Sequence, residues 1–135
     1  MMKYLAFDIE ISRELPDGVD DWKAFRPLGI SCAATMAEDA REPTLFFGRG
    51  RDGAPADQMS RQDAAGLVVF LQEKAAAGYT LLTWNGLGFD FDILAEESGL
   101  WEECRNLALD HVDMMFHAFC GLGYGISLDR AAKTM

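Results

Sequence analysis

The stretch YLAFDIEI, residues 4–11, has the aromatic and β-branched composition of a β-strand and is followed by a polar loop. Because side chains alternate across a strand, Asp8 and Glu10 share one face and the apolar residues between them take the other. Two carboxylates this close raise each other's pKa unless a cation lies between them. Hard divalent cations prefer carboxylate oxygens, so the strand predicts a site for Mg²⁺ or Mn²⁺ on its acidic face.

Two further strands are predicted downstream, over residues 29–36 and 44–47. A long connection over residues 12–27 precedes them, and a short acidic loop separates them. Consecutive strands with short connections usually pair as antiparallel neighbours. The first part of the chain therefore predicts a three-stranded meander.

The second part of the chain predicts helices and two more strands. Residues 60–63 resemble a capping box, and the helix after it ends at Gly78 with one apolar face made of Ala64, Leu67, Val68, Leu71 and Ala75. The strand at 80–84 follows that helix, which favours a crossover to a parallel neighbour. The remaining predictions are a loop at 85–88, a helix at 89–98, a fifth strand at 107–112, helices at 113–119 and 127–135, and a glycine-rich turn at 121–125.

These elements, in the order β-β-β-α-β-α-β-α, predict an α/β domain with a mixed sheet, and 135 residues fit a single domain over 1–135. The net charge of −10 leaves no broad basic face to grip duplex nucleic acid. Bound metal ions would still supply positive charge locally, so a metal-dependent nuclease is not excluded. No stretch has the length of a membrane span or a signal-peptide core, which predicts a cytoplasmic protein. Cys32, Cys104 and Cys120 lack paired spacing and predict reduced, mostly buried thiols.

Asp90 is the third candidate acid. It ends the segment NGLGFD, residues 85–90, between a predicted buried strand and a predicted helix. Backbone N–H groups at a helix N-terminus orient a carboxylate, which then can also ligate a metal. Asp92 lies about 200° further round the helix, so the two aspartates cannot face one site. An ordinary helix cap at Asp90, with solvated carboxylates at Asp8 and Glu10, remains the alternative.

The strand YLAFDIEIS at 4–12 and the segment TWNGLGFDFDIL at 83–94 together resemble the first two motifs of the DEDD-type 3'–5' exonucleases. The second segment matches the proofreading style of that family, in which the motif is N-x-x-x-F-D. The resemblance spans nearly the whole chain. It implies a ribonuclease H-like fold, whose sheet has three antiparallel strands followed by two parallel ones.

The resemblance also implies a role for each acid. Asp8 matches the acid that bridges two metal ions, and Glu10 matches the one that binds a metal and helps to orient the attacking water. Asp90 matches the second-motif ligand of the other metal. Two ions, Mg²⁺ or Mn²⁺, would then release nucleoside monophosphates from the 3' end of single-stranded DNA or RNA.

Substrate contacts follow from the same match. Asn85 corresponds to a position near the scissile nucleotide, and Phe89 corresponds to a packing residue that fixes the turn. Ile9 is also expected to contact the substrate. For Trp22 and Phe25 the sequence does not decide between stacking on bases and packing in the core, whereas core packing is predicted for Trp84. Solvated surface is predicted for Arg49, Arg51 and Arg61.

The chain departs from the family after these motifs. Ile11 and then Ser12 follow Glu10, where the family has Thr or Ser directly after that glutamate. The third motif, a Tyr or His a few residues before a fourth aspartate, has no convincing copy. Asp113 is predicted to cap its helix, and His111 and His117 to be structural. We therefore expect a fragment or truncation without its C-terminal helix, with little nuclease activity as it stands.

Three hypotheses result. The first is a metal-dependent 3'–5' exonuclease of ribonuclease H-like fold. The second is a catalytically inactive nucleic-acid-binding module that keeps this fold. The third is an unrelated acidic α/β domain whose carboxylates are solvated.

Overall fold

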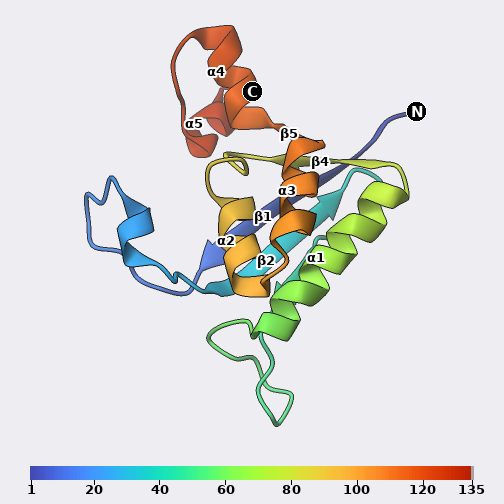
Figure 1. Ribbon diagram of the computed structural model, residues 1–135. Coiled ribbons are helices and arrows are strands. Elements are labelled where there is room, and N and C mark those ends of the chain that lie inside the picture. Colours follow the sequence, from blue (N-terminus) through green and yellow to red (C-terminus); the bar gives the residue numbers. More distant parts are fainter. Residues whose placement is uncertain (135) are drawn as a thin grey trace.

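The structure is a computed structural model and describes residues 1–134 (Figure 1). Its strands are β1 (Lys3–Ile11), β2 (Ile30–Ala37), β3 (Thr44–Phe47), β4 (Tyr79–Thr83) and β5 (His111–Asp113). Its helices are α1 (Arg61–Ala76), α2 (Asp90–Ser98), α3 (Trp101–Leu109), α4 (Met114–Leu122) and α5 (Leu128–Lys133), with a short 3₁₀ helix η1 (Trp22–Phe25).

The five strands form one mixed sheet in the order β3-β2-β1-β4-β5. The pairs β1–β2 and β2–β3 are antiparallel, whereas β4 runs parallel to both β1 and β5. This is the predicted ribonuclease H-like arrangement of three antiparallel strands followed by two parallel ones. It places YLAFDIEI on the central strand of the sheet.

One face of the sheet carries the hydrophobic core. Leu5, Phe7 and Ile9 of β1 are buried, as the alternation of the strand predicts. Helices α1, α2 and α3 lie over this face (Figure 1), and the ring of Phe91 on α2 is 5.7 Å from that of Phe7. Packing against α2 fixes β1 relative to the start of that helix.

Helix α1 confirms the helix that the sequence predicts after residues 60–63. The Ser60 side chain accepts from the N–H of Asp63, whose carboxylate accepts from the N–H of Ser60 in return. This reciprocal capping box satisfies two N–H groups that the first turn leaves free. The predicted apolar face is buried at Ala64, Leu67, Val68 and Leu71.

The predicted fifth strand is present in the sheet, but its predicted bounds, 107–112, were wrong. Residues 107–109 belong to α3, which no prediction covered, and β5 has only three residues. Gly99 ends α2 with φ +75°, and the chain then restarts as a helix with Cys104 and Leu107 buried three residues apart. That spacing is helical, but the segment is too short for its periodicity to outweigh the strand-like run after it.

Smaller corrections concern the C-terminal helices and the thiols. Helix α5 is shorter than the predicted 127–135, whose last residue, Met135, lies outside the described residues. Only Cys104 is buried, so the expectation of mostly buried thiols was wrong. No helix within residues 1–134 is long and apolar enough to cross a membrane.

The opposite face of the sheet is open and largely apolar. Ala6, Ala34, Met36 and Leu82 lie on it beside Asp8. Helices α4 and α5 border this face, and neither has a buried residue. The acidic residues of β1 therefore point away from the core, toward the uncovered side.

Candidate functional site

Asp90 is the acid that the fold positions most firmly. Strand β4 pairs with β1 only as far as Ala6, so the N–H of Ile9 lies beyond its strand partner. That N–H donates to Oδ1 of Asp90 at 3.2 Å, and Asp90 is only 2% exposed. A buried N–H must find an acceptor, and Asp90 supplies it. The first residue of α2 is thus tied to the residue that follows Asp8.

Burial and neighbouring charge make Asp90 a weaker acid than an ordinary aspartate. Burial raises its pKa to about 7, with the negative charges of Asp8 and Asp113 adding to this and the Ile9 hydrogen bond opposing it. The pKa of Asp8 is also raised, chiefly because its surroundings remove water from the carboxylate. Within residues 1–134, neither side chain is ion-paired with a basic residue. The two carboxylates form an uncompensated acidic pair.

Glu10 shares the open face of β1 with Asp8. Both residues are exposed, and positions two apart on a strand are separated by roughly 7 Å. In the part of the chain that the structure describes, no group of three or more His, Cys, Asp or Glu side chains is arranged to hold a metal ion. The site of Asp8, Glu10 and Asp90 therefore stays a prediction: the fold ties Asp90 to Ile9, the residue next to Asp8, and Glu10 lies on the same strand face as Asp8.

Asp113 holds the loop between β4 and α2. Its carboxylate accepts from the N–H groups of Asn85 at 2.9 Å and Leu87 at 3.2 Å, and from those of Met115 and Phe116 in the first turn of α4. The predicted cap is confirmed by the last two contacts. The first two were not foreseen, because they join residues 26 to 28 positions apart.

Asn85 has a clear conformational role in this loop. Its φ is +68°, a left-handed conformation that asparagine tolerates better than most residues. The next residue packs so closely that a Cβ at Gly86 would lie 2.3 Å from Oγ1 of Thr83. The predicted substrate contact of Asn85 stays a prediction, as does that of Ile9, whose side chain is buried.

Aromatic residues flank the start of α2. Phe89 packs edge-on against Trp22 of η1, with ring centroids 5.1 Å apart, and both are half-buried. Phe25 also packs against the core, which favours the packing interpretation for the 3₁₀ segment. Trp84 differs from its prediction, because it lines a pocket on the open face rather than joining the buried core.

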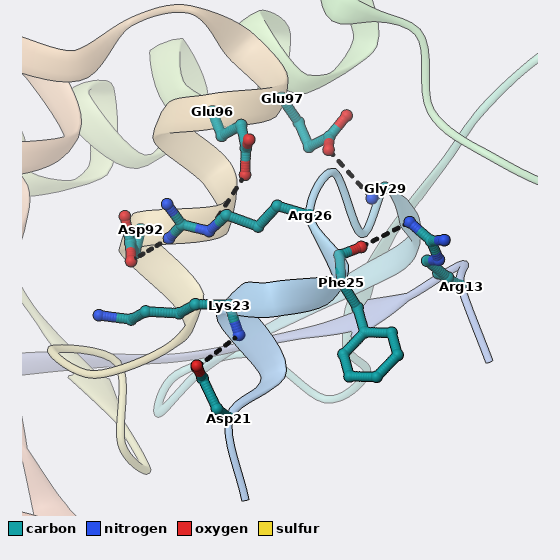
Figure 2. Close-up of polar contacts among 9 residues, drawn as sticks. All are labelled: Arg13, Asp21, Lys23, Phe25, Arg26, Gly29, Asp92, Glu96 and Glu97. Carbon is teal, nitrogen blue, oxygen red and sulfur yellow. Dashed lines mark hydrogen bonds and ion pairs between the residues drawn. The ribbon is translucent and has the colours of Figure 1, made fainter. Parts of the chain in front are cut away.

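Figure 2 shows how the β1–β2 connection is held on α2. Arg26 pairs with Asp92, and its Nε lies 3.5 Å from Oε2 of Glu96. The N–H of Gly29 donates to Oε1 of Glu97 at 3.0 Å. Asp92 therefore faces this connection while Asp90 faces β1, as the helical geometry predicted.

His111 is structural, as predicted. Its Nε2 lies 2.9 Å from Oγ1 of Thr83 and its Nδ1 lies 2.6 Å from the carbonyl oxygen of Ala108. The ring also packs edge-on against Phe91 at 4.8 Å. Its two ring nitrogens are thereby engaged in holding β5 to β4 and α3.

The solved structures to which this chain is similar are distant ones. No protein-family model matches the chain, and no curated protein matches it. The family B DNA polymerase of the hyperthermophilic archaeon Pyrobaculum calidifontis matches with a TM-score of 0.45 and 26% identity, covering 76% of this chain and 11% of the polymerase. Exonuclease I of E. coli, in complex with a dT13 oligonucleotide, matches with a TM-score of 0.44 and 14% identity, covering 73% of this chain and 24% of that protein.

A second structure of Exonuclease I matches with a TM-score of 0.37 and 14% identity, again covering 73% of this chain and 24% of the other. The chain thus spans between about a tenth and a quarter of the length of these proteins. All three TM-scores are below 0.5.

Proposed function

We propose that this chain is a metal-dependent nuclease domain that hydrolyses single-stranded nucleic acid from its 3' end. One observation supports it above the others: the buried carboxylate of Asp90 is tied through Ile9 to the strand that carries Asp8 and Glu10. Neither Asp8 nor Asp90 has a basic partner within residues 1–134. An acidic pair that the fold builds and leaves uncompensated is suited to a cation.

The donor chemistry fits Mg²⁺ or Mn²⁺. All three predicted ligands offer carboxylate oxygens, which hard divalent ions prefer, and the raised pKa of Asp90 is the cost of holding that acid without a cation. Asp8 and Asp90 would hold the ion, with Glu10 as the further ligand from the same strand. When bound, such an ion lowers the pKa of a water and offsets charge on the phosphate.

The surrounding residues have positioning roles in this proposal. The N–H of Ile9 fixes the carboxylate of Asp90, and Asp113 fixes the loop that precedes it. The rings of Phe89 and Trp22 pack against each other beside the start of α2. The chain thereby preorganises one acid from α2 beside the exposed acids of β1.

A second candidate is a catalytically inactive module of the same fold that binds nucleic acid. It is favoured by one observation: within residues 1–134, no three potential ligands already converge on one point. The unrelated acidic domain is the third interpretation. Cleavage of nucleic acid would support the nuclease, and binding without cleavage would support the inactive module. Neither cleavage nor binding would support the unrelated acidic domain.

The test is a cleavage assay on single-stranded DNA and RNA with a 5' label. With Mn²⁺, shortening one nucleotide at a time from the 3' end, even at the low rate expected of this chain, supports the proposal, and Asp8→Asn should abolish it. Asp17→Asn, at an exposed position in the β1–β2 connection, is the matched control and should leave it intact. Retarded but uncut oligonucleotide would instead support the inactive module. Internal cuts would contradict the 3' end preference.

A further inference from the structure

Helix α4 presents apolar side chains to solvent instead of to the core. Its sequence is MMFHAFCGL, and none of its residues is buried. Figure 1 shows α4 and α5 together at one end of the molecule, apart from α1 and α2. Phe116 and Phe119 of α4 are 59% and 47% exposed. Four further large side chains of the α4–α5 segment are exposed as well: Met114, Leu122, Tyr124 and Leu128.

The exposed residues of α4 share one side of the helix. Phe119 and Cys120 follow Phe116 by three and four residues, and these spacings make side chains neighbours on a helix surface. Cys120 is exposed like the two rings. Met115 and Ala118, which helical geometry places on the opposite side, are half-buried. The outward side of α4 therefore consists of two aromatic rings and a thiol.

The charge of this segment differs from that of the whole chain. Between Asp113 and Asp129 there is no Asp, Glu, Lys or Arg, although the chain has a net charge of −10. A nucleic acid backbone or an anionic membrane surface is held by Lys and Arg side chains, which the segment lacks. Two acidic molecules repel each other wherever their charged surfaces meet. An apolar segment without acidic residues is where two copies of this chain approach without that repulsion.

The exposed area is close to what a dimer needs. An aromatic side chain has about 150–250 Å² of surface. At their exposures, the six side chains named above together present on the order of 600 Å² to solvent. Standard interfaces bury about 800 Å² on each partner, and weak transient ones bury less than about 600 Å². An interface at the border of these classes indicates a dissociation constant on the order of micromolar.

We infer that two copies of this chain associate through α4, with the aromatic side of one helix packed against the same side of the other. One patch then serves both copies, as a two-fold symmetric dimer requires. The contact removes Phe116 and Phe119 from water and brings the Cys120 side chains of both copies to the interface. The inference is independent of the proposed function, because Asp8, Glu10 and Asp90 take no part in it.

Sedimentation equilibrium over a range of concentrations tests the association. The parent chain should show a monomer–dimer equilibrium. Phe119→Glu places a charge in the apolar contact and should raise the dissociation constant at least about tenfold. Val69→Glu is the matched control, because Val69 has a similar exposure of 46% but lies on α1. It should leave the equilibrium unchanged, and circular dichroism checks that both variants are folded.

Cross-linking through cysteine locates the contact without altering its apolar residues. A short bismaleimide should join two copies of the parent chain through Cys120. Cys120→Ser should abolish this covalent dimer. Cys32→Ser, which removes the other exposed thiol, should retain it.

Two results would overturn the inference. The parent chain could remain a monomer at every concentration, with no cross-linked dimer. Alternatively, it could form a dimer that persists in Phe119→Glu and is cross-linked through Cys32, in which case the copies would meet on the sheet and not on α4.

Discussion

Asp90 combines two effects that oppose each other. The hydrogen bond from Ile9 stabilises its ionised form, whereas burial and the charge of Asp8 destabilise it. Burial is the larger effect, since the pKa rises to about 7 in spite of that hydrogen bond. Without a cation the folded chain therefore holds a proton on Asp90 that the unfolded chain releases.

This proton gives the first prediction. Between the ordinary pKa of 3.8 and about 7, the native state binds more protons than the unfolded state. The stabilising contribution is complete below pH 3.8 and is lost as the pH rises through 7, by roughly 3–5 kcal/mol. Urea unfolding of parent and Asp90→Asn across pH 4–8 should show that the variant gains relative stability with rising pH. A constant difference would contradict the raised pKa, and Asp17→Asn serves as the control.

Among single residues, a role set by the neighbouring sequence could be predicted, whereas a role set by long-range contacts could not. Asp90 was predictable because a buried strand and a helix start bracket it. The capping of α4 by Asp113 was predictable for the same local reason. Its hold on the β4–α2 loop was not, because the partner Asn85 is 28 residues away. The open position of Trp84 likewise depends on what covers the sheet.

The loop between β4 and α2 depends on Asp113 as an element. Asp113→Ala removes four acceptor contacts, including those to Asn85 and Leu87. Loss of a helix cap costs about 0.5–2 kcal/mol and each buried donor left unsatisfied costs about 1–3 kcal/mol. We expect a loss of about 2–4 kcal/mol in the free energy of unfolding.

Hydrogen exchange should localise this effect. In Asp113→Ala the amides of Asn85 and Leu87 should exchange faster than in the parent. The control is Asp110→Ala, at an exposed aspartate that ends α3. Unchanged exchange at Asn85 and Leu87 would show that Asp113 does not hold the loop.

The β1–β2 connection depends on Arg26. Arg26→Gln leaves Asp92 and Glu96, one helical turn apart on α2, as neighbouring unpaired acids. The side chains of Arg26, Asp92 and Glu96 are 27% exposed, so these ion pairs are neither fully exposed nor fully buried. Exposed ion pairs contribute about 0.2–1 kcal/mol, whereas breaking a buried pair costs about 3–5 kcal/mol. We expect a loss of about 1–2 kcal/mol by urea unfolding. Lys23→Gln, an exposed cation of the same connection, should have no such effect.

The elements themselves show where sequence patterns suffice. The strand with YLAFDIEI and the capped helix α1 were predictable because alternation and helical spacing persist over many residues. Helix α3 was not, because it is short and directly precedes β5, so the apolar residues 107–109 that end the helix lie next to a strand. The pairing of β5 with β4 is also long-range.

For the whole molecule, the two faces of the sheet differ. Helices α1, α2 and α3 cover one face (Figure 1), while the other presents an apolar pocket bordered by Asp8. The chain carries 22 acidic and 12 basic residues, so no general positive field attracts nucleic acid. In the proposed function the bound cation supplies that attraction at one place. The molecule is therefore expected to depend on metal for both stability and substrate binding.

Melting with and without Mn²⁺ tests this dependence most directly. At 100 times its dissociation constant, a bound ion adds about 2.7 kcal/mol to the stability of the folded chain. For a chain of this size we expect the Tm to rise by about 5–12 °C. Asp8→Asn should abolish the rise, and Asp17→Asn should keep it. An unchanged Tm in the parent chain, or an equal rise in Asp8→Asn, would contradict a metal site at Asp8.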